Sequence, residues 1–166
     1  KGGTIELLLT RPLTEMQVVM AKYLAGVVLV LFSLIPTLLY YYSVHVLGSP
    51  AGNIDTGSMW GSYIGLFFLA AGFVSIGLFA SSVSDNQVVA FIIAVFLCFF
   101  CYAGFDSIST ILDTGSVANV IYLLGINAHY SSMSRGVIDT RDVIYFVSLV
   151  AIFVMMTRTV LESRKW

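Results

Sequence analysis

The chain has 166 residues, of which 58% are hydrophobic and 10% are charged, and its formal net charge is −1. About a quarter of the residues in a typical soluble domain are charged, so this composition excludes an ordinary soluble domain and indicates an integral membrane protein. The nearly neutral charge gives no sign of a nucleic-acid partner, and none is expected. The start of the sequence also lacks the basic, apolar and small-residue regions of a signal peptide.

Residues 4–11 are predicted to form a short amphipathic helix, because their apolar residues recur at the spacing of one helix face. Thr4 is a good N-cap, and the carboxylate of Glu6 in the first turn favours the positive end of the helix. Pro12 cannot continue the helix and favours an extended backbone at the residue before it. The apolar stripe consists of Ile5, Leu8 and Leu9. We expect this element to lie on one face of the membrane.

Four membrane spans are predicted, at residues 18–46, 59–82, 87–109 and 142–161. Each contains a long apolar run that suits the ~30 Å hydrocarbon core of a bilayer. The first span follows a capping box formed by Thr14 and Gln17. Pro36 inside it is expected to kink the helix, either as a functional hinge or as a packing device. The turn at residues 82–87 is so short that the third span must fold back antiparallel to the second.

The second span contains several pairs of small residues spaced four apart, a pattern that lets membrane helices approach closely. This spacing predicts that the span packs against other helices instead of facing lipid all round. The predicted helix-packing residues are Gly61, Gly65, Ala71, Ser75, Gly77 and Ser81.

Residues 114–136 form the least apolar part of the chain. Apolar residues at helical spacing predict an amphipathic helix that begins near Ser116 and breaks at Gly125. The sequence leaves two alternatives for the segment as a whole: an interfacial or re-entrant element, or a plain loop.

The distribution of lysine and arginine predicts the orientation. Four spans place both ends of the chain and the turn at residues 82–87 on one side of the membrane. That side carries Lys1, Arg11, Lys22, Arg158, Arg164 and Lys165, whereas the other carries Arg135 and Arg141. The positive-inside rule therefore predicts that both ends are cytoplasmic and that residues 114–136 are external.

Few side chains suggest chemistry, and no catalytic or metal-binding residue is predicted. The sequence contains no nucleotide-binding, esterase or zinc-protease motif, so an intramembrane enzyme is a weak hypothesis. Cys98 and Cys101 resemble a redox or zinc pair, but their apolar surroundings favour two small buried residues. His45 and His129 are both predicted to be external and are read as ordinary interfacial residues in preference to a metal pair. No charged residue lies near the middle of a span, so an ion-coupled transporter is not indicated.

Three segments resemble a known family in the expected order along the chain. Residues 3–13, with Lys22 after them, are similar to a G-T-L-E-x-L-L-x-x-P segment. Residues 76–90 are similar to an I-G-x-F-x-S-S-x-T-x-N-Q-x-x-A turn, with Ser84 where threonine is common. Residues 129–139 resemble an H-F…R-G-V-I-D element. The chain therefore resembles ABC type-2 transporter permeases, and most closely the gliding-motility-associated permeases of Bacteroidetes.

This resemblance implies a membrane permease subunit of an ATP-driven exporter in a bacterial inner membrane. Such permeases have six spans, so the chain resembles a fragment that begins after the second span, in agreement with its start at Lys1. They pair with a second permease subunit, as homodimers or heterodimers, and a separate ATP-binding subunit uses the ATP. This chain would bind no cofactor itself, and its single permease domain would cover residues 1–166.

The resemblance also assigns roles to individual residues. Residues 4–11 would be a cytoplasmic coupling helix that docks on the ATPase, and residues 114–136 would be external re-entrant helices that cap the pathway. The expected coupling residues are Thr4, Glu6, Leu8, Leu9, Arg11 and Pro12. The expected residues of the external segment are His129, Arg135 and Gly136. The alternative function is a structural anchor that recruits an ATPase to an envelope machine without transport.

Overall fold

The computed structural model describes residues 14–50, 52–112 and 115–163. Within these ranges every regular element is a helix, and four helical stretches are long and apolar enough to cross a membrane. The four stretches are Glu15–Leu47, Thr56–Val83, Gln87–Ile111 and Thr140–Ser163. The predicted class, an all-α polytopic membrane protein, is therefore confirmed. The predicted amphipathic helix at residues 4–11 lies outside the described residues.

The first stretch is not one continuous α-helix. It consists of α2 (Glu15–Leu34), a 3-10 turn η1 (Ile35–Thr37) and α3 (Leu38–Leu47). The predicted capping box is present at its start: the Gln17 N–H donates to Thr14 Oγ1 at 3.4 Å, and the Thr14 N–H donates to Gln17 Oε1 at 3.0 Å. Pro36 lies in η1, where its missing N–H and fixed φ interrupt the α-helical hydrogen bonds.

The capping box gives a first testable prediction. Thr14→Ala is expected to lower the free energy of unfolding by about 1 kcal/mol, because the Gln17 N–H loses its side-chain acceptor at the helix start. Thermal unfolding of the purified protein in detergent measures the change. Thr159→Ala is the matched control, since the Thr159 hydroxyl is exposed and bonds only to a carbonyl of its own helix. Equal destabilisation by the two variants would contradict the role of the cap.

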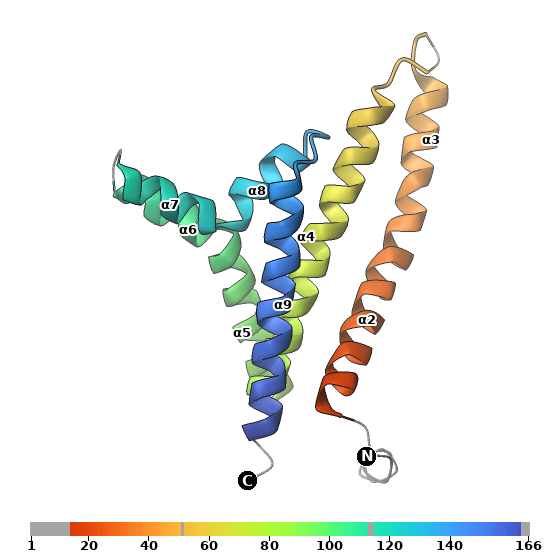
Figure 1. Cartoon of the computed structure of the whole chain (residues 1–166). Helices are drawn as coiled ribbons and strands as arrows, with labels where there is room; N and C mark the ends of the chain where they lie inside the picture. Colours follow the sequence, from red (N-terminus) through yellow and green to blue (C-terminus); the bar gives the residue numbers. More distant parts are fainter. Residues whose placement is uncertain (1–13, 51, 113–114, 164–166) are drawn as a thin grey trace.

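Helix α4 (Thr56–Val83) is the centre of the bundle and packs against α2, α5 (Gln87–Phe99) and α9 (Thr140–Ser163). Figure 1 shows that α2 begins and α9 ends at the lower end of the bundle, as drawn, where α4 also turns into α5. At this turn the Asn86 side chain caps α5 by accepting from the Val88 N–H at 2.9 Å. The α3–α4 connection lies at the upper end.

Two buried clusters hold the bundle together. Near the lower end, Val19 and Tyr23 of α2 pack with Val154 of α9. Higher in the bundle, Ile76 of α4 and Phe146 of α9 are fully buried together with two residues of α8. Lipid is as apolar as these side chains, so close van der Waals packing, and not removal from water, stabilises these contacts inside a bilayer. The specific packing therefore lies along α4 and α9.

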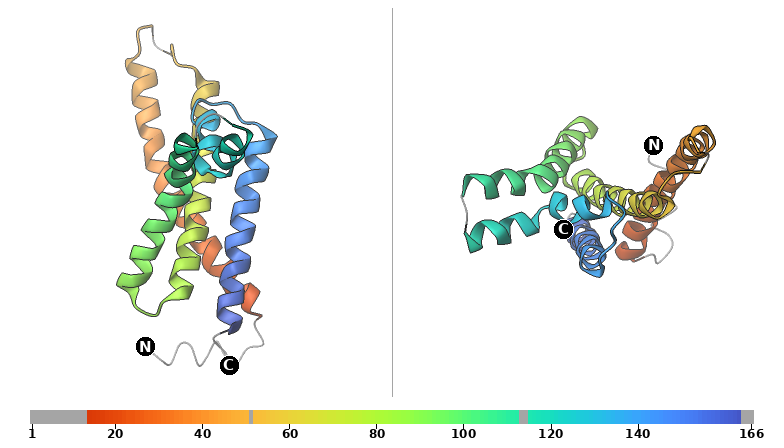
Figure 2. Two further views of the ribbon diagram at one scale, coloured as in Figure 1. Left: turned by 90° about the vertical axis from the view of Figure 1, so that its left-hand side faces the viewer. Right: turned by 90° about the horizontal axis from the view of Figure 1, so that it is seen from above.

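Three short helices lie at the upper end and are called here the lateral helices: α6 (Phe105–Ile111), α7 (Ser116–Leu124) and α8 (Ile126–Met133). A π-helical turn, η2 (Phe100–Gly104), separates α6 from α5. Figures 1 and 2 show that α6 turns away from the axis of α5 and runs beside α7, to one side of the bundle. The predicted third span, 87–109, therefore includes most of a helix that does not continue in the direction of α5.

Most of residues 114–136 is helical, so this segment is not a plain loop. Its interfacial or re-entrant position stays a prediction. As the spacing predicted, α7 begins at Ser116 and ends before Gly125, whose extended backbone (φ −79°, ψ 145°) breaks the helix.

Candidate functional site

The candidate site is the junction where the lateral helices and the chain after them meet the upper ends of α4 and α9. The small residues of α4 form one side of it. A Cβ built on Gly61 would clash with the backbone of Gly136, and a Cβ on Gly65 would lie 2.7 Å from the Cβ of Met133. Gly136 itself has φ +84°, a conformation that favours glycine. Two of the predicted packing residues thus contact the predicted external segment.

Serine hydroxyls reinforce this contact. Ser58 Oγ donates to the carbonyl of Arg135 at 3.0 Å, and Ser62 Oγ lies 2.8 Å from the carbonyl of Ser134. Both carbonyls belong to the segment that links α8 to α9, so their hydrogen bonds tie that segment to α4. The segment is held by backbone contacts, which leave it little room to shift without breaking them.

The other side of the site is a polar cluster called here the His129 cluster: His129, Ser132, Asp142 and Tyr145. His129 Nδ1 lies 2.7 Å from Asp142 Oδ1, and Ser132 Oγ donates to Asp142 Oδ2 at 2.7 Å. Asp142 is only 7% exposed, so its carboxylate depends on these donors in place of water. The Tyr145 ring stacks on the His129 ring with centroids 4.0 Å apart.

The His129 cluster also binds the end of α7. His129 Nε2 lies 2.9 Å from the Leu123 carbonyl, and the Tyr145 hydroxyl donates to the Leu124 carbonyl at 2.7 Å. These carbonyls belong to the last turn of α7 and have no helical N–H partner, so the two side chains satisfy them. His129 therefore links Asp142 of α9 to the last turn of α7 through its two ring nitrogens.

The remaining predicted residues lie in several environments. Ala71 and Ser75 are buried in α4, near the close contact of Gly72 with Leu149 of α9. The space beside Gly77 is open, and the Ser81 side chain is exposed. The Arg135 side chain is also exposed and donates from Nε to the Ser131 carbonyl at 3.1 Å. Among the predicted coupling residues, none is described: Thr4, Glu6, Leu8, Leu9, Arg11 and Pro12 all lie outside the described ranges.

Sequence reasoning missed most of the partners in the site. It did not single out Asp142, although a carboxylate beside a long apolar run and 13 residues after a histidine is a usable signal. Ser58, Ser62 and Ser132 carried no signal at all. His45 contacts Tyr41 in α3, so the two histidines have separate partners. Within the described ranges, no group of three or more histidine, cysteine or acidic residues is placed to hold a metal ion.

Comparison with known proteins gives one match. A family model described as "ABC-2 family transporter protein" matches residues 1–163. No curated protein and no solved structure matches the chain.

Proposed function

The chain belongs to the ABC-2 family of transporter proteins and is a membrane permease subunit of an ABC transporter. On this premise we propose that it forms the translocation path of an exporter that is driven by a separate ATP-binding subunit. The observation that carries the proposal is a continuous series of contacts from the start of α2 to the lateral helices. Such a series is what a force applied at one end of the bundle needs in order to act at the other.

The series begins at α2, which packs through Val19 and Tyr23 on Val154 of α9. It continues along α4 and α9 to Gly61 of α4, which contacts the chain next to α8. From there the His129 cluster reaches the end of α7. A tilt of α2 relative to α4 and α9 would therefore change the contacts that position the lateral helices.

In the proposed mechanism, ATP-driven closure of the partner subunits pushes on residues 4–11, which precede the capped start of α2. Glu6 and Arg11 contact the ATPase, and α2 follows the displacement because few residues separate them from Thr14. The spans then alternate between inward and outward access, and the lateral helices cap the external end of the path.

The finer assignments belong to the same proposal. The chain lies in a bacterial inner membrane, with its ends and the α4–α5 turn cytoplasmic, as the distribution of lysine and arginine favours. It pairs with a second permease subunit, as a homodimer or heterodimer. The resemblance of the chain to the gliding-motility-associated permeases supports a role of the exporter in gliding motility.

Charge reversal tests the proposed docking. Glu6→Lys combined with Arg11→Glu is expected to reduce recovery of the ATP-binding subunit in a pull-down from detergent at least tenfold, because two favourable charge contacts become repulsive. Arg141→Glu is the matched control, since Arg141 is exposed and lies at the opposite end of the bundle. Unchanged recovery with the double variant would overturn the docking assignment.

The second candidate function is a structural anchor that recruits an ATPase to an envelope machine without transport. The close contacts of Gly61, Gly65 and Gly72 favour it, because tightly packed small residues make a rigid bundle. Release of an envelope component from the membrane that depends on ATP hydrolysis would support the exporter. Recovery of envelope proteins together with an ATPase, but without any translocated substrate, would support the anchor.

A further inference from the structure

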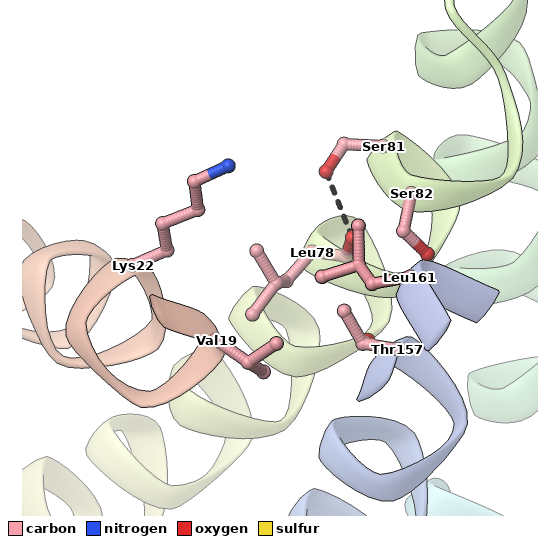
Figure 3. Close-up of a pocket in the computed structure, with 7 residues that line it drawn as sticks. All are labelled: Val19, Lys22, Leu78, Ser81, Ser82, Thr157 and Leu161. Carbon is pink, nitrogen blue, oxygen red and sulfur yellow. Dashed lines mark hydrogen bonds between the residues drawn. The ribbon is translucent and has the colours of Figure 1, made fainter. Parts of the chain in front are cut away.

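A hollow of about 90 Å³ opens at the lower end of the bundle, where α2, α4 and α9 meet. Figure 3 shows the seven side chains that line it: Val19, Lys22, Leu78, Ser81, Ser82, Thr157 and Leu161. The hollow is far from the His129 cluster, and none of the predicted functions uses it.

The lining of the hollow has an apolar part and a polar part. Val19, Leu78 and Leu161 supply apolar surface, and the hydroxyls of Ser81, Ser82 and Thr157 supply polar groups. Figure 3 shows the Lys22 side chain extending from α2 toward the side where Ser81 lies. Among the described residues that line the hollow there is one cation and no carboxylate, and this charge favours an anion.

The hydroxyls can act as donors to such an anion. They bond to carbonyls of their own helices: Ser81 Oγ to Leu78, Ser82 Oγ to Phe79 and Thr157 Oγ1 to Phe153, at 2.8, 2.7 and 2.7 Å. Carbonyls inside a helix already accept a backbone N–H, so a hydroxyl can turn toward a ligand without leaving a buried carbonyl unpaired.

The Lys22 ammonium is also available. The ion pairs within the described ranges are Arg158 with Glu162 and His129 with Asp142, and neither includes Lys22. An ammonium group has three donors, which suit the oxygen atoms of a phosphate as a compact point charge. The side chain is exposed, so a ligand can reach it from outside the bundle.

We propose that this hollow binds the phosphate group of an anionic phospholipid. Lys22 and the hydroxyls donate to the phosphate oxygens, while Val19, Leu78 and Leu161 contact the glycerol and the first methylene groups. The hollow has room for a phosphate group. Basic pockets between membrane helices on the cytoplasmic side bind lipid headgroups in this way.

The cytoplasmic placement rests on the orientation in the proposed function. The bound lipid bridges α2 to α4 and α9, close to the segment that leads into the proposed coupling helix. A phosphate carried by a small soluble molecule has the same chemistry as the headgroup, and the apolar half of the lining favours the lipid.

The test uses the full-length protein, purified in a phosphate-free detergent without its ATPase, so its result does not depend on transport. Binding of dihexanoyl phosphatidylglycerol, dihexanoyl phosphatidylcholine and inorganic phosphate is measured by titration. Saturable binding of the phosphatidylglycerol is expected, about tenfold weaker in Lys22→Gln because one charge-assisted contact is lost. Thr157→Val, which keeps the shape of the side chain, is expected to weaken binding about threefold.

Arg158→Gln is the control, since Arg158 carries a charge one residue from Thr157 but does not line the hollow. It is expected to bind the lipid within twofold of the unchanged protein. Equal affinities of Lys22→Gln and Arg158→Gln would overturn the proposal. Inorganic phosphate binding as tightly as the lipid would overturn the lipid as the source of the phosphate group.

Discussion

Gly61→Ala is expected to lower the free energy of unfolding by about 2–3 kcal/mol, because the new methyl group would overlap the backbone of Gly136. A backbone cannot rotate away as a flexible side chain can, so the segment between α8 and α9 must move. That movement would also strain the hydrogen bonds from Ser58 and Ser62. Thermal unfolding in detergent gives the stability, and trypsin cleavage after Arg135 reports release of the segment.

Gly77→Ala is the matched control on the same helix, because a Cβ at Gly77 meets nothing within 4 Å. Alanine has the higher helix propensity, so this variant is expected to be neutral or stabilising by up to about 1 kcal/mol. The two glycines differ in surroundings and not in helix, which isolates the effect of the contact. Similar stability and similar trypsin cleavage of the two variants would contradict the close approach of α4 to Gly136.

Asp142→Leu is expected to cost about 3 kcal/mol of unfolding free energy, because it removes the acceptor of two hydrogen bonds in a buried polar cluster. Ser132 Oγ and His129 Nδ1 would both lose their acceptor in a region where water has little access. Asp142→Asn retains an oxygen that can accept from His129 and is expected to restore about half of the loss. Thermal unfolding of the purified variants in detergent measures both changes.

A double-mutant cycle distinguishes the pair from a general effect of the substitution. His129→Leu combined with Asp142→Leu is expected to be less destabilising than the sum of the single changes, with a coupling of about 1–2 kcal/mol. The reason is that an apolar pair leaves no unpaired charge behind. Strictly additive losses would show that His129 and Asp142 do not interact in the folded protein.

Much of the fold could be predicted because its signals are local. Long apolar runs predict spans, and the capping box of Thr14 and Gln17 is readable from two residue types at a fixed spacing. The direction of α6 could not be predicted. Its departure from α5 follows a π-helical turn at Phe100–Gly104, whose sequence contains no proline and no charged residue to mark a change of direction. Hydrogen-bond register is not encoded in hydrophobic periodicity.

The site was harder to predict than the fold for a physical reason. Spacing of small residues identifies a helix face that permits close approach, but it does not identify what approaches. Gly61 and Gly65 contact the chain around Met133 and Gly136, whereas Ser81, which has the same spacing signal, is exposed. Asp142 resembled an ordinary polar end of a span, because only the folded chain brings His129 and Ser132 to it.

The first helical stretch is longer than the hydrocarbon core of a typical bilayer is thick. Its 33 residues correspond to roughly 50 Å at 1.5 Å per residue, against a hydrocarbon core of about 30 Å. Its upper part, α3, has no buried residue, so bundle packing does not fix its angle. Hydrophobic mismatch must therefore be relieved by tilt or by local thickening of the bilayer. The acyl-chain length of the surrounding lipids is therefore expected to change the tilt of this stretch, whether or not a ligand is bound.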